Sequence, residues 1–168
     1  MPLSIYDILV PTANRFLGAL DKSLDKAADF AKRKEIDAAV LLNSRLAPDM
    51  FPFTRQVQIA CDMIKGGAAR LSSTEVPKFD DNEATVEDLK ARVGKTRDFI
   101  NSISAEKFAG GETRDILLQM RRGDLKFVGL DYLRDYVLPN FHFHLTVAYA
   151  ILRHNGVELG KQDYLGNT

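Results

Sequence analysis

All three histidines of this chain lie in one short stretch, PNFHFHLTVAYAILRHNG, at residues 139–156. Clustered histidines raise the hypothesis of a metal site, because imidazole is a common metal ligand. On a helix, each residue advances about 100° around the axis and about 1.5 Å along it. His142 and His144 then point to opposite faces, and His154 lies about 15 Å along the axis from His144. These three side chains cannot chelate one ion among themselves.

A different pair in the same stretch does share a face. Asn140 and His144 are four residues apart, which separates them by only about 40° around the helix and about 6 Å along it. They follow Pro139, which removes a backbone donor and predicts a kink at this point. This pair is the strongest candidate that the last helix offers for a binding site.

The other chemically capable side chains have simpler interpretations. Cys61 is the only cysteine, lacks a basic neighbour and lies beside Asp62, so we interpret it as a packed small residue rather than a nucleophile. His142 shares a face with Tyr149, and this face could line a cleft or form an interface or a solvated surface. His154 falls in a last helical turn, where a protonated ring favours the helix dipole.

Composition excludes several classes of protein. Lysine plus arginine equals aspartate plus glutamate at 23 each, so no global charge attracts nucleic acid. No apolar run approaches the roughly 20 residues that span a bilayer, so we expect no membrane partner. The N-terminus lacks the basic and apolar regions of a signal peptide, which predicts a cytoplasmic protein.

The elements that must position these residues can be read from apolar spacing and capping signals. Ser4 predicts the start of a first helix, and a capping-box spacing at Thr85 predicts another over residues 86–102. Alternating apolar residues on both sides of Arg122-Gly123-Asp124 predict a β-hairpin. Further helices are expected over residues 53–71 and from about residue 130 to 155. We therefore predict one domain over residues 1–168, an all-α four-helix bundle of antiparallel type with a small β-hairpin inserted before the last helix.

Three stretches carry a resemblance to a known family. They are Arg45–Gly66 (RLAPDMFPFTRQVQIACDMIKG), Phe127–Leu133 (FVGLDYL) and Asn140–Gly166. Together with the order of helices and hairpin, they resemble the DinB/YfiT-like four-helix-bundle superfamily, in an uncharacterised bacterial branch without assigned function. The resemblance covers nearly the whole chain, and it implies a homodimer.

The resemblance also implies where a metal would bind. Metal-binding members of the superfamily use one histidine from the second helix and two, four apart, from the last helix. Here those positions are implied to hold Gln58, Asn140 and His144, with Asp62 one turn beyond Gln58. Amide oxygens are weak ligands for zinc or nickel. The resemblance therefore implies a degenerate metal site, with no cofactor assigned unless a carboxylate such as Asp62 completes a divalent cation site.

Several functions remain open at this stage. The first is a homodimeric protein that is non-catalytic or binds a small polar or carboxylated ligand at Gln58, Asp62, Asn140 and His144. The second is a metal-dependent enzyme, a hydrolase or thiol-dependent transferase, with a divalent cation held by His144 and its neighbours. The third is an interaction module in which these side chains form only a buried polar cluster.

Overall fold

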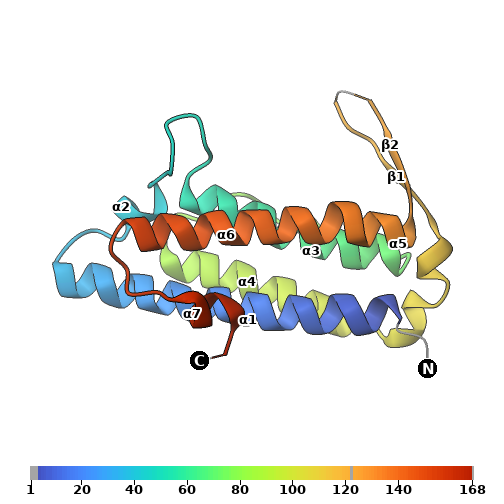
Figure 1. The fold of residues 1–168 in the computed structure, drawn as a ribbon, viewed down its shortest axis with the longest axis horizontal. Helices are drawn as coiled ribbons and strands as arrows, with labels where there is room; N and C mark the ends of the chain where they lie inside the picture. Colours follow the sequence, from blue (N-terminus) through green and yellow to red (C-terminus); the bar gives the residue numbers. More distant parts are fainter. Residues whose placement is uncertain (1–3, 122, 168) are drawn as a thin grey trace.

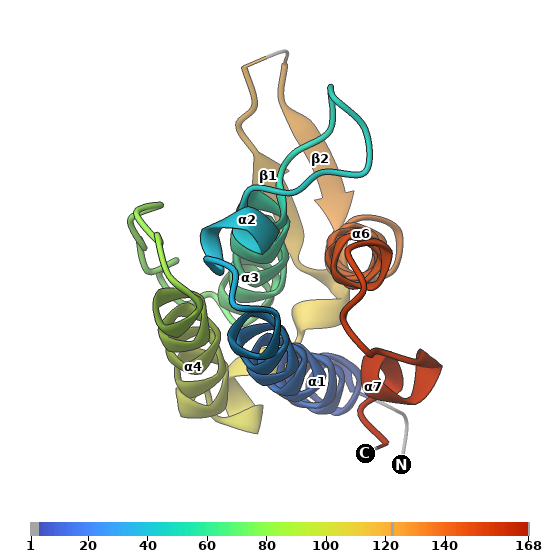
Figure 2. The ribbon, with the colours of Figure 1, turned by 90° about the vertical axis from the view of Figure 1, so that its left-hand side faces the viewer.

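Four long helices form the body of the molecule in a computed structural model that describes residues 4–121 and 123–167 (Figure 1). They are α1 (Ile5–Lys34), α3 (Phe53–Leu71), α4 (Val86–Ser102) and α6 (Leu138–His154). Viewed end-on, they surround a shared interior, with α3 between α4 and α6 (Figure 2). The structure thus confirms the predicted helical bundle with an inserted hairpin.

Two of the helices begin at the capping boxes that the sequence predicts. The Ser4 hydroxyl accepts from the backbone N–H of Asp7 at 3.2 Å, and the Asp7 carboxylate accepts from the N–H of Ser4. Thr85 and Asp88 form the same reciprocal pair at the start of α4. Backbone N–H donors, first that of Ala84, lower the pKa of the Asp88 carboxyl. Each box satisfies donors that a helix start leaves unpaired.

The relative direction of α3 and α4 differs from the antiparallel arrangement that we predicted. In Figure 1, the sequence colours of α3 and α4 both advance toward the end of the bundle that carries the hairpin. The helices therefore run parallel, and residues 72–85 must return along the bundle between them. This crossover explains why that long connection carries side chains into the α3–α4 groove.

The predicted hairpin consists of β1 (Asp115–Leu118) and β2 (Leu125–Val128), paired antiparallel with Leu118 opposite Leu125. Gly123 adopts a φ of 117°, a value that suits glycine in a tight turn. Arg122, at the predicted tip, lies outside the described residues. The hairpin projects beyond the helices at one end of the bundle (Figure 1).

The segment predicted as one long last helix has three parts. A short helix α5 (Gly129–Asp131) leads into a π-helical segment, η3 (Tyr132–Val137), and then into α6. The irregular segment ends at Val137, two residues before Pro139, where the sequence predicted a kink. The side chain of Asn140 donates to the Tyr136 carbonyl at 2.7 Å and so partners a backbone acceptor of η3.

Several short elements were not predicted. They are α2 (Ala39–Leu42), the 3-10 turns η1 (Ala105–Phe108) and η2 (Gly111–Thr113), and α7 (Lys161–Leu165). Helix α7 packs against α1 beside the Lys26–Asp163 ion pair at 2.6 Å (Figure 2). These elements are too short for apolar periodicity to reveal them.

The core is continuous through the bundle and holds the site-bearing helix in place. Val57, Ile64 and Phe141 are fully buried, on α3 and α6. Gly67 lets α3 approach η3 closely, since an added Cβ would lie 2.6 Å from Val137 Cγ1. Among the described helices, none has the length and apolar character needed to cross a membrane.

Candidate functional site

His144 faces α3, but its partner there is Gln56 and not the predicted Gln58. His144 Nδ1 lies 2.7 Å from Gln56 Oε1, while Gln56 Nε2 donates to the Phe51 carbonyl at 3.1 Å. Because a carbonyl oxygen only accepts, Nδ1 carries the proton. Burial, and secondly the charge of Arg55, lower the pKa of His144 and favour the neutral ring.

Gln58 belongs to a different side of α3. Its side chain is buried, accepts from Arg55 Nη1 at 3.0 Å and donates to Glu83 Oε2 at 2.8 Å. Residues that are two positions apart on a helix point about 200° from each other, so Gln56 and Gln58 cannot both face α6. The structure therefore does not bring Gln58 and His144 together.

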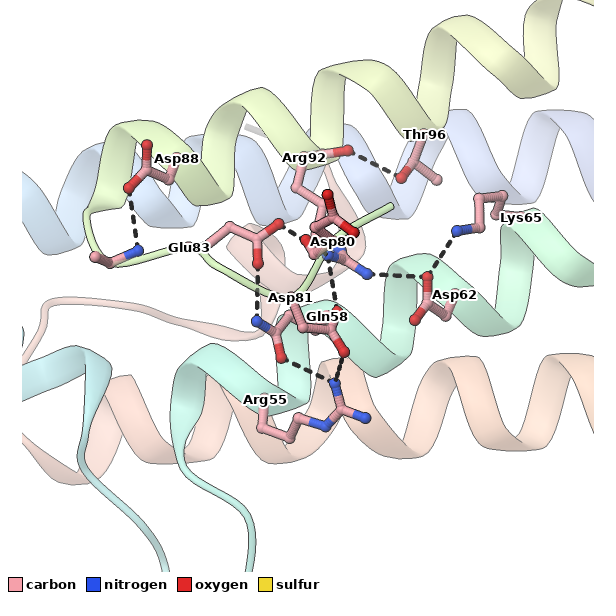
Figure 3. Close-up of polar contacts among 11 residues, drawn as sticks. Arg55, Gln58, Asp62, Lys65, Asp80, Asp81, Glu83, Asp88, Arg92 and Thr96 are labelled. Atoms are coloured by element: carbon pink, nitrogen blue, oxygen red, sulfur yellow. Dashed lines mark hydrogen bonds and ion pairs between the residues drawn. The ribbon is translucent and has the colours of Figure 1, made fainter. Parts of the chain in front are cut away.

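Asp62 is part of an ion cluster between α3, α4 and the crossover loop (Figure 3). Its Oδ1 accepts from Arg92 Nη2 at 3.0 Å and from Lys65 Nζ at 2.9 Å. Arg92 also contacts Glu83 Oε1 at 2.8 Å and Asp81 Oδ1 at 3.0 Å. We call these residues, with Arg55 and Gln58, the Arg92 cluster.

The Arg92 cluster is internally neutral, and it is closed to solvent at its centre but open at its edge, where the side chains of Asp62, Arg55 and Asp81 are 35–41% exposed. The Arg92 side chain is 1% exposed, and those of Lys65 and Glu83 are 5% and 7% exposed. The ring of Phe79, from the crossover loop, lies 4.0 Å from Lys65 Nζ. Burial opposes a charged Arg92, but the Glu83 hydrogen bond and the nearby carboxylates outweigh it and raise the pKa of Arg92. The cluster therefore fastens the crossover loop to the two parallel helices.

The residues at the metal position that the resemblance implies are not arranged to bind a metal ion. Asn140 bonds to its own helix, Gln58 points into the Arg92 cluster, and the Asp62 carboxylate already binds two cations. At these positions, only the Nε2 atom of His144 remains as a nitrogen that could bind a metal. Within residues 4–121 and 123–167, no three His, Cys, Asp or Glu side chains are placed to hold an ion. The described hydrogen bonds join none of the four predicted residues to one another.

The remaining candidates are covered by packing. Cys61 is fully buried, and burial raises the pKa of its thiol to about 12, which agrees with a packed residue rather than a nucleophile. The face of His142 packs against α7, whose Tyr164 hydroxyl lies 3.3 Å from His142 Nδ1. Tyr149 contacts the same Tyr164 ring, with centroids 5.9 Å apart. The unpredicted α7 therefore covers part of this face and leaves His142 and Tyr149 half-buried.

A cleft of about 450 Å³ opens on the other side of α3, between this helix, the hairpin and η3. This volume is in the range of small-molecule sites. Its lining comprises Asp62, Met63, Arg70, Leu117, Leu118, Gln119, Met120, Tyr132 and Tyr136. Of the residues predicted to form a ligand site, only Asp62 lies on it. We call it the hairpin cleft.

Arg70 is held in place within the hairpin cleft. Its Nη1 donates to the Tyr132 hydroxyl at 3.2 Å. An added Cβ on Gly66 would lie 2.5 Å from Arg70 Nη1, so the missing side chain of Gly66 provides the space in which the guanidinium lies. Among the described residues, Arg70 forms no ion pair with a carboxylate.

Aromatic rings form one wall of the hairpin cleft. Tyr132 and Tyr136 stack with centroids 5.7 Å apart and an interplanar angle of 19°, and Phe127 of β2 contacts both. Tyr132 is 1% exposed, and burial raises the pKa of its phenol despite the nearby Arg70 charge. Tyr132 therefore keeps its proton at neutral pH, and the three rings form a continuous aromatic wall.

Sequence reasoning missed this cleft, although two signals were present. Gly66-Gly67 inside a helix is unfavourable unless a neighbour needs the space, and both glycines here face a specific side chain. The tyrosines of the last helix lie four residues apart, which places them on one face. What the sequence did not reveal is that the π-helical turn and the hairpin bring this face opposite Arg70.

Comparisons with known proteins agree with the fold and leave the activity open. The family model described as domain of unknown function DUF1993 matches residues 5–165. The crystal structure of a DinB family member from Shewanella denitrificans is 43% identical to this chain. The similarity covers 96% of this chain and 92% of that one, with a TM-score of 0.89. No curated protein matches the chain significantly.

Proposed function

Since this chain belongs to the DUF1993 family of DinB-like proteins, we propose that it is a small-ligand-binding helical bundle whose ligand occupies the hairpin cleft. The observation that carries this proposal is the position of Arg70, held over Gly66 and against Tyr132 on the wall of a cleft of about 450 Å³. A pre-positioned charged group beside apolar walls is the usual composition of a small-molecule site.

The lining favours binding over catalysis. Among the described lining residues there is no serine, threonine, cysteine or histidine, so the cleft lacks a nucleophile paired with a base. Asp62, the one carboxylate on the lining, is committed to Arg92 and Lys65. The groups that remain can orient a ligand by hydrogen bonds and ring contacts.

A ligand-observed NMR screen of small carboxylates, amides, amines and thiols tests this proposal. Hits should raise the melting temperature by mass action, and Tyr136→Ala should weaken them because it removes part of the wall. Met63→Ala should also change affinity, whereas Met50→Ala, a half-buried methionine outside the cleft, should not. Hits that survive both cleft variants, or a screen without hits, would contradict the proposal.

We also propose that the protein is a homodimer, as the family resemblance implies. Leu117, Met120, Leu125 and Val128 of the hairpin region are 41–50% exposed, which supports an apolar contact there. Light scattering should give a molar mass twice that of one chain. Leu125→Lys should reduce the molar mass to that of a single chain. Ile36→Lys, at a similarly exposed residue on another part of the surface, is the control. A monomer at all concentrations contradicts the proposal.

A further inference from the structure

The hairpin cleft contains hydrogen-bond donors that the fold leaves unused. A guanidinium has five N–H donors, and among the described residues only one acceptor, the Tyr132 hydroxyl, receives one from Arg70. Because that hydroxyl accepts from Arg70, its own proton is free to donate, and no described residue accepts it. Two adjacent groups thus present donors without acceptors at one end of the cleft.

The end of the hairpin cleft that contains Arg70 is positively charged. Asp62 is eight residues before Arg70, about 12 Å away along α3, and it is neutralised by Arg92 and Lys65. Arg70 has no such counter-ion among the described residues. An anionic group is therefore what the Arg70 end lacks, and a planar carboxylate matches the fork of a guanidinium.

The rest of the cleft suits an apolar body. Its lining includes Met63, Met120 and Leu118 in addition to the stacked tyrosines. Tyrosine rings favour contact with another ring in an offset or edge-on arrangement, and methionine adapts to irregular apolar shapes. A ligand whose carboxylate binds Arg70 would thus place its apolar body against aromatic rings and thioethers.

Resting on the proposed function, we infer that the ligand is a small aromatic carboxylate. Its carboxylate binds the Arg70 guanidinium and the Tyr132 hydroxyl, and its ring lies against Tyr136 and Met63. Gly66 is a positioning residue, because only glycine leaves the space that holds the Arg70 side chain.

Three probes of matched shape test the inference: phenylacetate, phenylacetamide and phenethylamine, titrated by calorimetry at neutral pH. Phenylacetate should bind at least tenfold more tightly than the neutral amide, and the amine should bind weakest. Arg70→Met should weaken phenylacetate at least tenfold and leave the amide within about twofold. Arg134→Met, which removes the same charge from an exposed helix position, is the matched control and should change neither.

Two further variants separate position from charge. Gly66→Ala keeps Arg70 but displaces its guanidinium, and the fold should tolerate it because the displaced atoms end a flexible side chain. We expect a loss of phenylacetate affinity between those of wild type and Arg70→Met. Tyr132→Phe should weaken phenylacetate about threefold to tenfold, the loss of one hydrogen bond. Unchanged affinity in Gly66→Ala would overturn the positioning role.

The remaining outcomes distinguish this inference from the proposed function. If the amide or the amine binds as tightly as phenylacetate, and Tyr136→Ala abolishes that binding, the cleft is a ligand site but the carboxylate inference is wrong. If none of the probes binds at up to ~10 mM, a concentration that detects even weak affinity, both are overturned.

Discussion

Helix α3 has polar side chains on two sides, and the two sides differ in how completely they are paired. Toward α4, the Arg92 cluster pairs three cations with three carboxylates, those of Asp62, Asp81 and Glu83. Toward the hairpin, Arg70 and Tyr132 contact each other and otherwise keep unused donors. The first arrangement balances its charges and leaves only Arg92 Nε without an acceptor among the described buried atoms of the cluster, whereas the second has a cation without a carboxylate.

This difference separates a structural polar cluster from a candidate binding site. Buried charges persist where partners surround them, and such a set holds chain segments together. The half-buried Arg70 guanidinium, on a cleft without a carboxylate, costs little while water reaches it and is available to a ligand. Counting partners, rather than polar residues, therefore supports the proposal that the ligand binds in the hairpin cleft and not at the Arg92 cluster.

The largest expected effect comes from breaking the closed side. Arg92→Met leaves the buried Glu83 without its counter-ion, and removing one partner of such a buried pair costs about 3–5 kcal/mol. Chemical denaturation would measure the free energy of unfolding. Arg134→Met is the control, since that side chain is 61% exposed and its solvent-screened ion pairs should contribute little to stability. Equal effects would mean that Arg92 does not fasten the loop.

The close contact behind the cleft should be the next most sensitive point. Gly67→Ala places a Cβ 2.6 Å from Val137, and such overpacking costs about 1–3 kcal/mol. Gly94→Ala in α4 meets nothing within 4 Å and should stabilise the fold by about 0.5–1 kcal/mol. Thermal denaturation should shift the two variants in opposite directions. A shift of the same sign in both would show that α3 does not depend on this approach to η3.

Asp62 allows a direct test of the difference between the two sides of α3, because it belongs to the Arg92 cluster and also lines the hairpin cleft. Asp62→Asn keeps one acceptor but removes the charge facing Lys65 and Arg92, and we expect a loss of about 1–2 kcal/mol of stability. Phenylacetate affinity should change by less than about twofold, because about 12 Å along α3 exceeds the screening length at physiological salt. A large change in affinity would place Asp62 in the ligand site instead.

The smallest effect is expected at His144. Its pKa lies below the ordinary 6.5, chiefly through burial, so the folded state favours the neutral ring. The unfolded chain then binds more protons as pH falls through about 6.5, and the folded state loses stability there. His144→Gln should flatten the melting temperature between about pH 5 and pH 8. Parallel profiles for the variant and the wild type would refute this assignment.

Much of the fold could be predicted because its signals are local. Ser4 and Thr85 begin helices through hydrogen bonds that span three residues, and the limits of α4 at Val86 and Ser102 follow from them and from apolar spacing. The hairpin also follows from local alternation. The parallel course of α3 and α4 was not predicted, because the direction of a helix after a long loop depends on distant packing.

The same distinction between local signals and distant packing applies to the candidate site. The sequence by itself determined the fold family, the inward position of His144 and the packed state of Cys61, since these depend on motifs and helical spacing. Only the tertiary structure decided which partner each polar group meets. Gln56 rather than Gln58 reaches His144, and Arg70 meets Tyr132 across 62 residues of chain. Such pairings depend on helix rotation and on a π-helical turn, both set by contacts between segments that are remote in sequence.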